Sequence, residues 1–131
     1  MVEVVVGALL RDGQVLLGHR SPEKRAYPGV WDLPGGVIEE GETELVALAR
    51  ELYEELGIRI ASGSTSHLVR LTVGVEDHSA QLSAWLVRDW DGTPFNAAPE
   101  EHDDLGWFDL EELPVLAHAP VREALIAATQ T

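Results

Sequence analysis

Hydrophobic residues along this chain follow two spacings, one typical of β-strands and one typical of a helix. Two apolar runs, at 2–10 and 15–19, are separated by Asp12-Gly13, a dipeptide that favours a tight hairpin turn. Proline, glycine and acidic residues interrupt the later apolar stretches. They leave short predicted strands at 30–33, 58–60, 68–75, 82–87 and 106–109. Loops are expected at 21–29, 91–92 and 94–104, and Pro34-Gly35-Gly36 is expected to end a strand.

The segment 43–56 shows the clearest helical spacing. Its apolar positions fall three, four, seven and eleven residues after the first, which predicts one buried stripe made of Leu45, Leu48, Ala49, Leu52 and Leu56. Thr43 is suited to the N-cap, and Gly57 stands where a helix commonly ends in a left-handed residue. A second helix is predicted at 120–129. Strands, a central helix and a closing helix predict an α/β domain with one helix packed on each side of a sheet.

The composition restricts the partners of this chain. With 131 residues, of which 45% are apolar, it is expected to form one domain over 1–131. Nine basic residues against 23 acidic ones give a net charge of −14, which would repel a nucleic acid polymer. The chain has no cysteine and no apolar run of the roughly 18 residues that a membrane span needs. We therefore expect a cytoplasmic protein with no membrane partner.

Three glutamates on the first predicted helix form a separate pattern. Glu51, Glu54 and Glu55 share one face, which helical geometry places roughly 120° from the centre of the leucine stripe. Like charges at this spacing repel one another, and the C-terminal end of a helix disfavours negative charge. A cation that collects these oxygens would offset the cost, and hard oxygen ligands suit Mg²⁺ or Mn²⁺. A solvated acidic helix face is the alternative interpretation.

The sequence around these glutamates resembles a known motif. Gly36 is followed after five residues by Glu42 and after seven more by the run Arg50-Glu51-Leu52-Tyr53-Glu54-Glu55-Leu56-Gly57-Ile58. This pattern, at 36–58, matches every fixed position of the Nudix box, so the chain resembles the Nudix hydrolases, and in particular their MutT-like members. The resemblance covers nearly the whole chain. It implies a mixed β-sheet sandwiched between helices, with a loop-helix-loop catalytic motif.

The resemblance also implies roles for residues inside the box. Glu51, Glu54 and Glu55 match metal-binding glutamates, and the carbonyl of Gly35 matches a further ligand of Mg²⁺, for which Mn²⁺ can substitute. Glu51 and Glu54 are the favoured candidates for the general base. Arg50 matches the arginine that orients these carboxylates. Glu42 matches a residue that supports the loop.

Other members of the family take one more acidic ligand or base from a loop outside the box. Glu101 precedes Trp107 by six residues, as in MutT-like members, and Glu100 is the neighbouring alternative. A solvated acidic loop is the competing interpretation. The remaining histidines, which show no spacing typical of a metal site, are interpreted as surface or sheet residues: His19, His67, His78 and His102.

Substrate contacts are expected from segments outside the box. Arg20, close to the pair Lys24-Arg25, is the first candidate for a phosphate contact. Tyr27 and Trp31 are candidates for stacking on a base, with Phe95 a weaker one. His118 stands where enzymes acting on oxidised guanine present an asparagine. Histidine cannot make the paired donor and acceptor contacts of an amide, so this departure argues against that specificity.

The resemblance predicts a hydrolase that cleaves a phosphoanhydride in a small nucleotide. The layout of the chain favours a (deoxy)nucleoside triphosphate, converted to monophosphate and pyrophosphate. ADP-ribose and other nucleoside diphosphate derivatives are the alternatives. A Nudix-fold binding module without catalysis is a different class, but such modules commonly lack one or more of the glutamates present here. An unrelated acidic interaction domain would leave the motif unexplained. Because family members are often dimers, a homodimer is compatible with the resemblance.

Overall fold

The computed structural model describes residues 1–24, 27–74 and 79–130. Its helices are α1 (Glu44–Leu56) and α2 (Ala119–Thr129). Its strands are β1 (Val2–Arg11), β2 (Gln14–Arg20), β3 (Trp31–Asp32), β4 (Gly35–Val37), β5 (Arg59–Ile60), β6 (Thr65–Val73), β7 (Ala80–Val87), β8 (Trp90–Asp91) and β9 (His102–Asp109). Arg25, Val75 and His78, which the sequence analysis mentions, lie outside the described residues.

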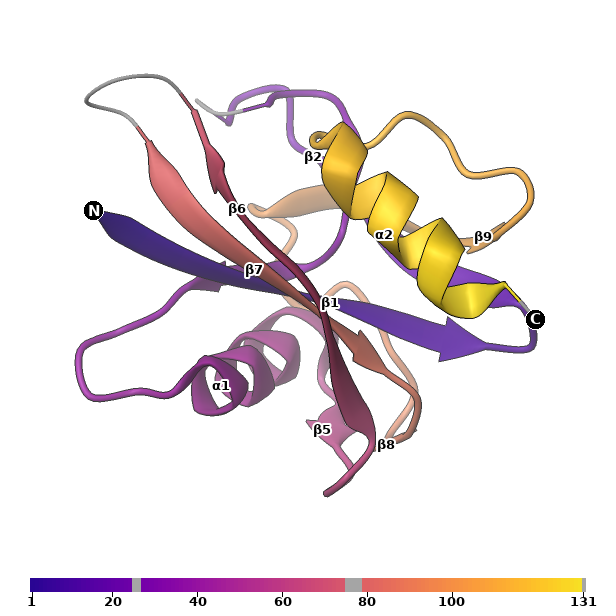
Figure 1. The fold of residues 1–131 in the computed structure, drawn as a ribbon, viewed down its shortest axis with the longest axis horizontal. Helices are drawn as coiled ribbons and strands as arrows, with labels where there is room; N and C mark the ends of the chain where they lie inside the picture. The colour runs from indigo at the N-terminus through magenta and orange to yellow at the C-terminus, as the bar shows by residue number, and fades with distance from the viewer. Residues whose placement is uncertain (25–26, 75–78, 131) are drawn as a thin grey trace.

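The long strand β1 is the centre of a mixed sheet (Figure 1). It pairs in parallel with β7 from Val2 to Leu9, and β7 pairs antiparallel with β6. Along its other edge, β1 pairs first with β4 and then with β2. β2 continues the sheet to β3 and β9. The predicted hairpin is confirmed: Asp12 and Gly13 both have positive φ, as a tight turn between these strands requires.

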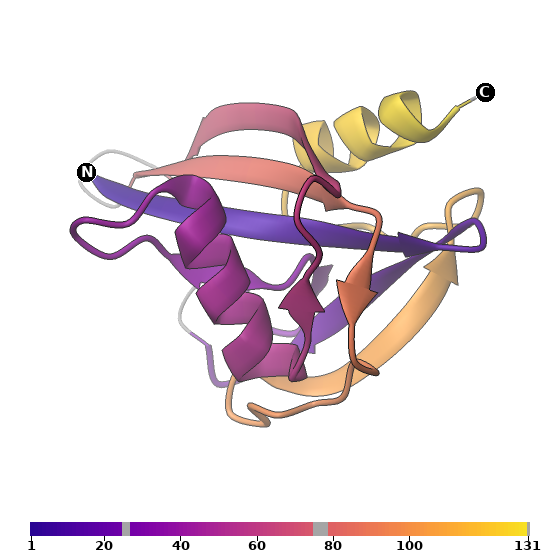
Figure 2. The ribbon, with the colours of Figure 1, turned by 90° about the horizontal axis from the view of Figure 1, so that it is seen from below.

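Alternate residues of β1 belong to two different hydrophobic cores. Val5 and Leu9 pack with the buried residues of α1. Val6 and Ala8 pack on the opposite face, in the core that includes Val121 of α2 and its neighbours. The helices consequently cover the two sides of the sheet, as Figure 2 shows. This confirms the predicted arrangement of one helix on each side.

The caps of α1 agree with the sequence, and its buried face agrees in part. The Thr43 side chain accepts a hydrogen bond from the amide of Val46 at 3.2 Å, and Gly57 has φ 72° at the end of the helix. Leu45 and Ala49, expected in the buried stripe, are exposed. The other three residues of the predicted stripe, Leu48, Leu52 and Leu56, are buried, together with Ala47 and Glu55.

Polar contacts explain why the helix is rotated in this way. Glu44, in the first turn of α1, accepts hydrogen bonds from Trp85 at 2.9 Å and from Ser83, both on β7. Burial raises the pKa of Glu44, but these two donors and Arg70 together outweigh burial and lower it. The start of the helix is therefore fixed to the sheet by Glu44 rather than by Leu45.

Three segments predicted as breaks or loops lie at least partly in strands. Gly35 and Gly36 form β4, because the edge of β1 offers pairing partners at Val6 and Val5. Gly35 has φ 153°, and a Cβ there would lie 2.0 Å from the carbonyl oxygen of Val5, so only glycine allows this close approach. The expected loop 94–104 ends early, since β9 begins at His102 through pairing with β2. Similarly, Asp91 pairs with Arg59 in the small β5–β8 sheet.

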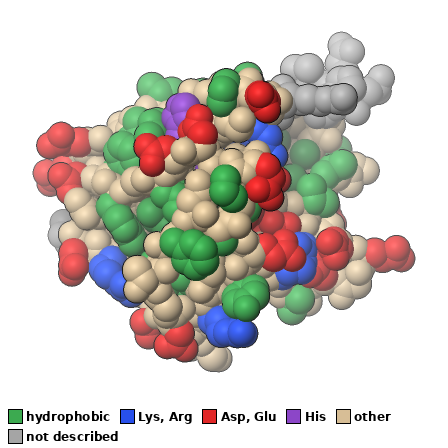
Figure 3. Space-filling view, turned by 180° about the vertical axis from the view of Figure 1, so that it is seen from behind, with side chains coloured by type: hydrophobic (Ala, Val, Ile, Leu, Met, Phe, Trp, Pro, Cys, Tyr) green, Lys and Arg blue, Asp and Glu red, His purple; other side chains and the backbone are tan. Residues whose placement is uncertain are grey.

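The surface carries much of the negative charge. Figure 3 shows acidic side chains spread over much of the face opposite to that in Figure 1. Within the described residues, no helix is both long enough and apolar enough to cross a membrane.

Candidate active site

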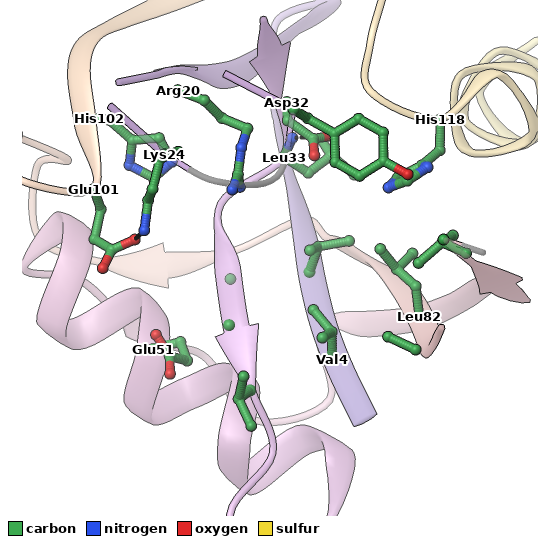
Figure 4. Close-up of a pocket in the computed structure, with 18 residues that line it drawn as sticks. Val4, Arg20, Lys24, Asp32, Leu33, Glu51, Leu82, Glu101, His102 and His118 are labelled. Atoms are coloured by element: carbon green, nitrogen blue, oxygen red, sulfur yellow. Dashed lines mark hydrogen bonds and ion pairs between the residues drawn. The ribbon is translucent and has the colours of Figure 1, made fainter. Parts of the chain in front are cut away.

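A cleft of about 500 Å³ runs beside β4 and across the start of β1. Figure 4 shows its two ends. At one end, Glu51 of α1 lies near Glu101 and Lys24. At the other end, His118 lies just before α2. Between the ends, Arg20 projects into the cleft, and apolar residues of the sheet, including Val4 and Leu82, line it.

The segment that carries Glu101 is attached to the end of α1 by its backbone. The amide of Phe95 donates to the carbonyl of Leu56 at 3.1 Å, and that of Ala97 donates to the carbonyl of Glu55 at 2.9 Å. The last carbonyls of a helix have no partner within the helix, so this segment satisfies two of them. These bonds hold residues 95–102 against the glutamate-bearing helix and bring Glu101 into the cleft.

Arg50 connects the loop of the box to its helix. Its guanidinium donates to both carboxylate oxygens of Glu42, at 2.8 and 2.9 Å, and to Glu51 at 2.9 Å. It also donates to the carbonyl of Val37 at 3.0 Å. The hydrogen bond from Arg50, followed by that from the amide of Glu39, lowers the pKa of Glu42 to about 2. Glu42, in turn, is the main cause of the raised pKa of Arg50.

The three glutamates of the helix lie in different environments. Glu51 lines the cleft, where its carboxylate packs so closely on Gly36 that a Cβ there would lie 2.5 Å from the Glu51 Cδ atom. The side chain of Glu54 is 56% exposed and lies 3.5 Å from Arg50, outside the lining of the cleft. Helical spacing predicts that Glu55 points away from the apolar stripe. Glu55 is nevertheless buried, together with Leu52 and Leu56 of the same helix.

Glu55 faces a histidine that the sequence analysis did not select. His102 Nδ1 lies 3.7 Å from Glu55 Oε1, and neither atom has a hydrogen-bond partner among the described residues. Burial, reinforced by the charges of Glu51 and Glu101, raises the pKa of Glu55 well above its usual range. Burial also lowers the pKa of His102. His102 fits here because Gly18 of β2 has no side chain; a Cβ at Gly18 would lie 2.4 Å from the imidazole.

Glu101 lies in the cleft and pairs with the ammonium group of Lys24. Glu100, the neighbouring alternative, is exposed and does not line the cleft. The two partners of the ion pair come from the loop after β2 and from the segment before β9.

The end of the cleft near α2 contains one acid and two aromatic rings. Tyr27 and His118 line it and meet edge to face, with ring centroids 4.6 Å apart. Asp32 is buried there and accepts a hydrogen bond from the amide of Leu33 at 2.9 Å. Burial raises the pKa of Asp32 to about 6, although that amide and the charge of Arg20 oppose the shift. Burial and the charge of Arg20 lower the pKa of His118.

Two aromatic candidates for base contact are placed elsewhere. Trp31 does not line the cleft; its ring packs edge to face against His19 and Phe108, at centroid distances of 5.0 and 4.7 Å. As β3 alternates sides, Asp32 rather than Trp31 reaches the cleft. Phe95 covers Gly57 at the end of α1, where a Cβ would lie 2.3 Å from its ring.

Asp32 and His102 were not predicted as site residues from the sequence, and Lys24 was named only as a neighbour of Arg20. A signal for Asp32 was available, since an acid between Trp31 and Leu33 in a short strand is unusual unless it has a specific role. No such signal marks His102. His102 stands in an acidic run that the sequence predicts to be a solvated loop. Its burial depends on Gly18 in a distant strand.

The donor set at the Glu51 end suits a hard divalent cation. It consists of carboxylates, and one buried oxygen of Glu55 has no partner among the described residues. Among residues 1–24, 27–74 and 79–130, no three acidic or histidine side chains are gathered closely enough to hold an ion as they stand. Two of these carboxylates have cationic partners: Glu51 pairs with Arg50 and Glu101 with Lys24. The oxygens fit the ion chemically, and its binding would require some of these pairs to rearrange.

Comparisons with known proteins agree with this fold and cleft. The sequence model of the NUDIX domain matches residues 1–129. The CTP pyrophosphohydrolase of Escherichia coli K12 is 36% identical, over 98% of this chain and 90% of that protein. A putative 8-oxo-dGTP diphosphatase of Mycobacterium tuberculosis is also 36% identical, over 95% of this chain and 84% of that protein. The crystal structure of a MutT NUDIX hydrolase from Burkholderia pseudomallei has 30% identity and a TM-score of 0.82, with 95% of each chain covered.

A mixed sheet between two helices, with a glutamate-bearing helix beside a cleft, defines an α/β fold of the Nudix type. The chain belongs to the Nudix hydrolase family and has MutT-like relatives.

Proposed function

We propose that this enzyme converts a nucleoside triphosphate to the monophosphate and pyrophosphate in a Mg²⁺-dependent reaction. The observation that carries the proposal is the division of one cleft into a carboxylate end and an aromatic end, with Arg20 between them. A triphosphate nucleotide has the matching division into a charged chain and a planar base. Relatives named as a CTP pyrophosphohydrolase and a putative 8-oxo-dGTP diphosphatase support this substrate class.

At the carboxylate end, Glu51, Glu54, Glu55 and the carbonyl of Gly35 would hold Mg²⁺, with Glu101 as a further ligand. When bound, the ion would neutralise phosphate charge and lower the pKa of a coordinated water. Arg50 holds Glu51 in place by a hydrogen bond of 2.9 Å, and Glu51 lines the cleft, so it is the better placed of the two candidate bases. In this proposal Glu51 takes a proton from the attacking water while the water oxygen bonds to a phosphorus and the P–O anhydride bond breaks, which separates the monophosphate from pyrophosphate.

At the aromatic end, the base would lie among Tyr27, His118 and the apolar floor that includes Leu82. Apolar lining with a few polar groups is typical of sites that bind small planar ligands. Arg20 projects between the two ends and is suited to contact a phosphate oxygen.

The test is a panel of common and oxidised nucleoside triphosphates, ADP-ribose and dinucleoside polyphosphates, each incubated with Mg²⁺, Mn²⁺ or EDTA. Products are separated by chromatography. Release of a monophosphate and pyrophosphate from a triphosphate, abolished by EDTA, is the expected outcome. Cleavage of ADP-ribose alone, or activity that is indifferent to EDTA, would contradict the proposal. Water labelled with ¹⁸O then identifies the phosphorus under attack, because the label appears in the monophosphate or in the pyrophosphate.

A further inference from the structure

Lys24 and Glu101 form an ion pair inside the cleft, between segments 77 residues apart in the sequence. Figure 4 shows the ammonium group of Lys24 directed at the Glu101 carboxylate, at the same end of the cleft as Glu51. The Lys24 side chain is 28% exposed and that of Glu101 is 43% exposed. The pair is thus partly covered by the cleft, but both of its members remain within reach of a ligand that enters.

The position of this pair creates a competition. Glu101 lines the cleft at the same end as the carboxylate of Glu51. Under the proposed function, a divalent cation would collect these oxygens, including those of Glu101. Lys24 already pairs with Glu101. Two cations that both contact one carboxylate repel each other. A metal ion that binds at Glu101 therefore competes with Lys24 for this carboxylate.

Displaced from Glu101, Lys24 would be a positive charge in a cleft that receives a polyphosphate. A lysine is a compact point charge on a flexible stem, so a small movement can bring it to a different anion. Pairs that are this exposed are weak, and exchanging one anion for another costs little.

We propose that Lys24 exchanges partners: it pairs with Glu101 in the free enzyme and contacts the phosphate chain of the substrate once a divalent cation occupies Glu101. This inference rests on the proposed function. It makes Lys24 a binding residue for the polyphosphate and couples the arrival of the metal ion to the formation of that contact. Consequently, Lys24 should oppose the binding of the metal ion alone and favour the binding of the nucleotide together with the metal ion.

The test measures these two effects separately in the Lys24→Met variant. Titration calorimetry with Mn²⁺ alone should show metal binding about three- to tenfold tighter than in the wild type, because the competing cation is gone. Binding of an α,β-methylene nucleoside triphosphate, which cannot be hydrolysed at that linkage, should be about tenfold weaker in the presence of Mg²⁺. Lys24→Arg should restore most of the analogue binding. Circular dichroism verifies that each variant is folded.

Arg70→Met is the matched control, because it also removes one positive charge and one ion pair with a glutamate. Arg70 pairs with Glu44, and neither residue lines the cleft. Any general effect of the more negative net charge on Mn²⁺ binding should appear in both variants. Only Lys24→Met is expected to change the two affinities in opposite directions.

Three outcomes would overturn the exchange. If Lys24→Met weakens Mn²⁺ binding, Lys24 orients Glu101 for the ion rather than competing with it. If Lys24→Met behaves like Arg70→Met in both titrations, the pair is only a surface contact. Either result, in an enzyme that hydrolyses a triphosphate, leaves the proposed function intact. A wild-type enzyme that neither binds Mn²⁺ nor hydrolyses a member of the panel would overturn the exchange and the proposed function together.

Discussion

The two ends of the cleft are built in different ways. At the carboxylate end, one continuous segment carries Arg50 and the two glutamates that it links, Glu42 and Glu51, through hydrogen bonds of 2.8 to 2.9 Å, and the Lys24–Glu101 pair is added from distant segments. The aromatic end is assembled from β3, from the loop after β2 and from the residue before α2.

The surroundings of Arg50 and the aromatic end also differ in how they treat charge. Around Arg50, direct pairing stabilises ionised groups, and the pKa of Glu42 falls to about 2. At the aromatic end, burial disfavours ionised groups, so the pKa of Asp32 rises to about 6 and that of His118 falls. A local motif can supply a charge together with its partner. Asp32 and His118, in contrast, are covered by a surface that distant segments assemble, and burial dominates their pKa values. Substitutions at the two ends should therefore have different consequences, in activity at the first and in pH-dependent stability at the second.

The largest effect is expected from Glu51→Gln at the carboxylate end. Loss of a carboxylate that lines the cleft and is the favoured base should lower kcat about a hundredfold or more, as removal of general base catalysis does. The amide can still accept the hydrogen bond from Arg50, so the melting temperature should change little. Steady-state kinetics on the substrate identified by the panel give the result. Glu123→Gln, on the exposed face of α2, is the control, and a variant with nearly normal kcat would remove Glu51 from the catalytic group.

The next effect is a gain in stability from Asp32→Asn at the aromatic end. Because the pKa of Asp32 is raised in the folded state from 3.8 to about 6, folding favours its neutral form. The stability that Asp32 contributes is complete below about pH 4 and is lost as the pH rises through about 6. The amide stays neutral, so above pH 7 the variant should be more stable by up to about 3 kcal/mol.

Urea unfolding of Asp32→Asn and wild type across pH 4.5 to 8 measures this difference in the free energy of unfolding. The difference should be small at the acidic end and should grow through pH 6. A difference that is independent of pH would show that Asp32 is ionised in the folded protein throughout this range.

A smaller effect is expected from Gly36→Ala, which tests how closely the helix approaches the sheet. The new Cβ would lie 2.5 to 2.6 Å from the carboxylate of Glu51, so this side chain must move. We expect kcat to fall about tenfold, while the free energy of unfolding changes by about 1 kcal/mol or less. Kinetics and thermal melting together give the result. Unchanged kcat would mean that the observed position of Glu51 is not needed for catalysis.

The smallest effect is expected from His118→Ala. His118 lines the aromatic end and meets Tyr27 at a centroid distance of 4.6 Å, so its loss should remove part of the surface on which the base lies. We expect KM to rise about three- to tenfold with kcat nearly unchanged, as for the loss of an aromatic contact in binding. Equal losses in kcat and kcat/KM would instead place His118 among the groups that act in the transition state.

Much of the fold could be predicted from the sequence where neighbouring residues decide the conformation. Asp12-Gly13 predicts the hairpin because these residues tolerate positive φ, and Thr43 and Gly57 set the ends of α1 for similarly local reasons. The spacing of the box likewise brings Glu51, Glu54 and Glu55 onto neighbouring turns of that helix. These features depend on dihedral preferences and helical geometry, which act over a few residues.

Only the tertiary structure decided which of these side chains are buried and with what they pair. Leu45 is exposed and Glu55 is buried because β7 supplies hydrogen-bond donors to Glu44 and thereby fixes the rotation of α1. Gly35 and Gly36 become a strand because β1 offers an unpaired edge. Lys24 meets Glu101 through the pairing of β2 with β9, which brings together residues 77 apart in the sequence. Burial and ion pairing are properties of the space around a side chain, and that space is formed by distant segments.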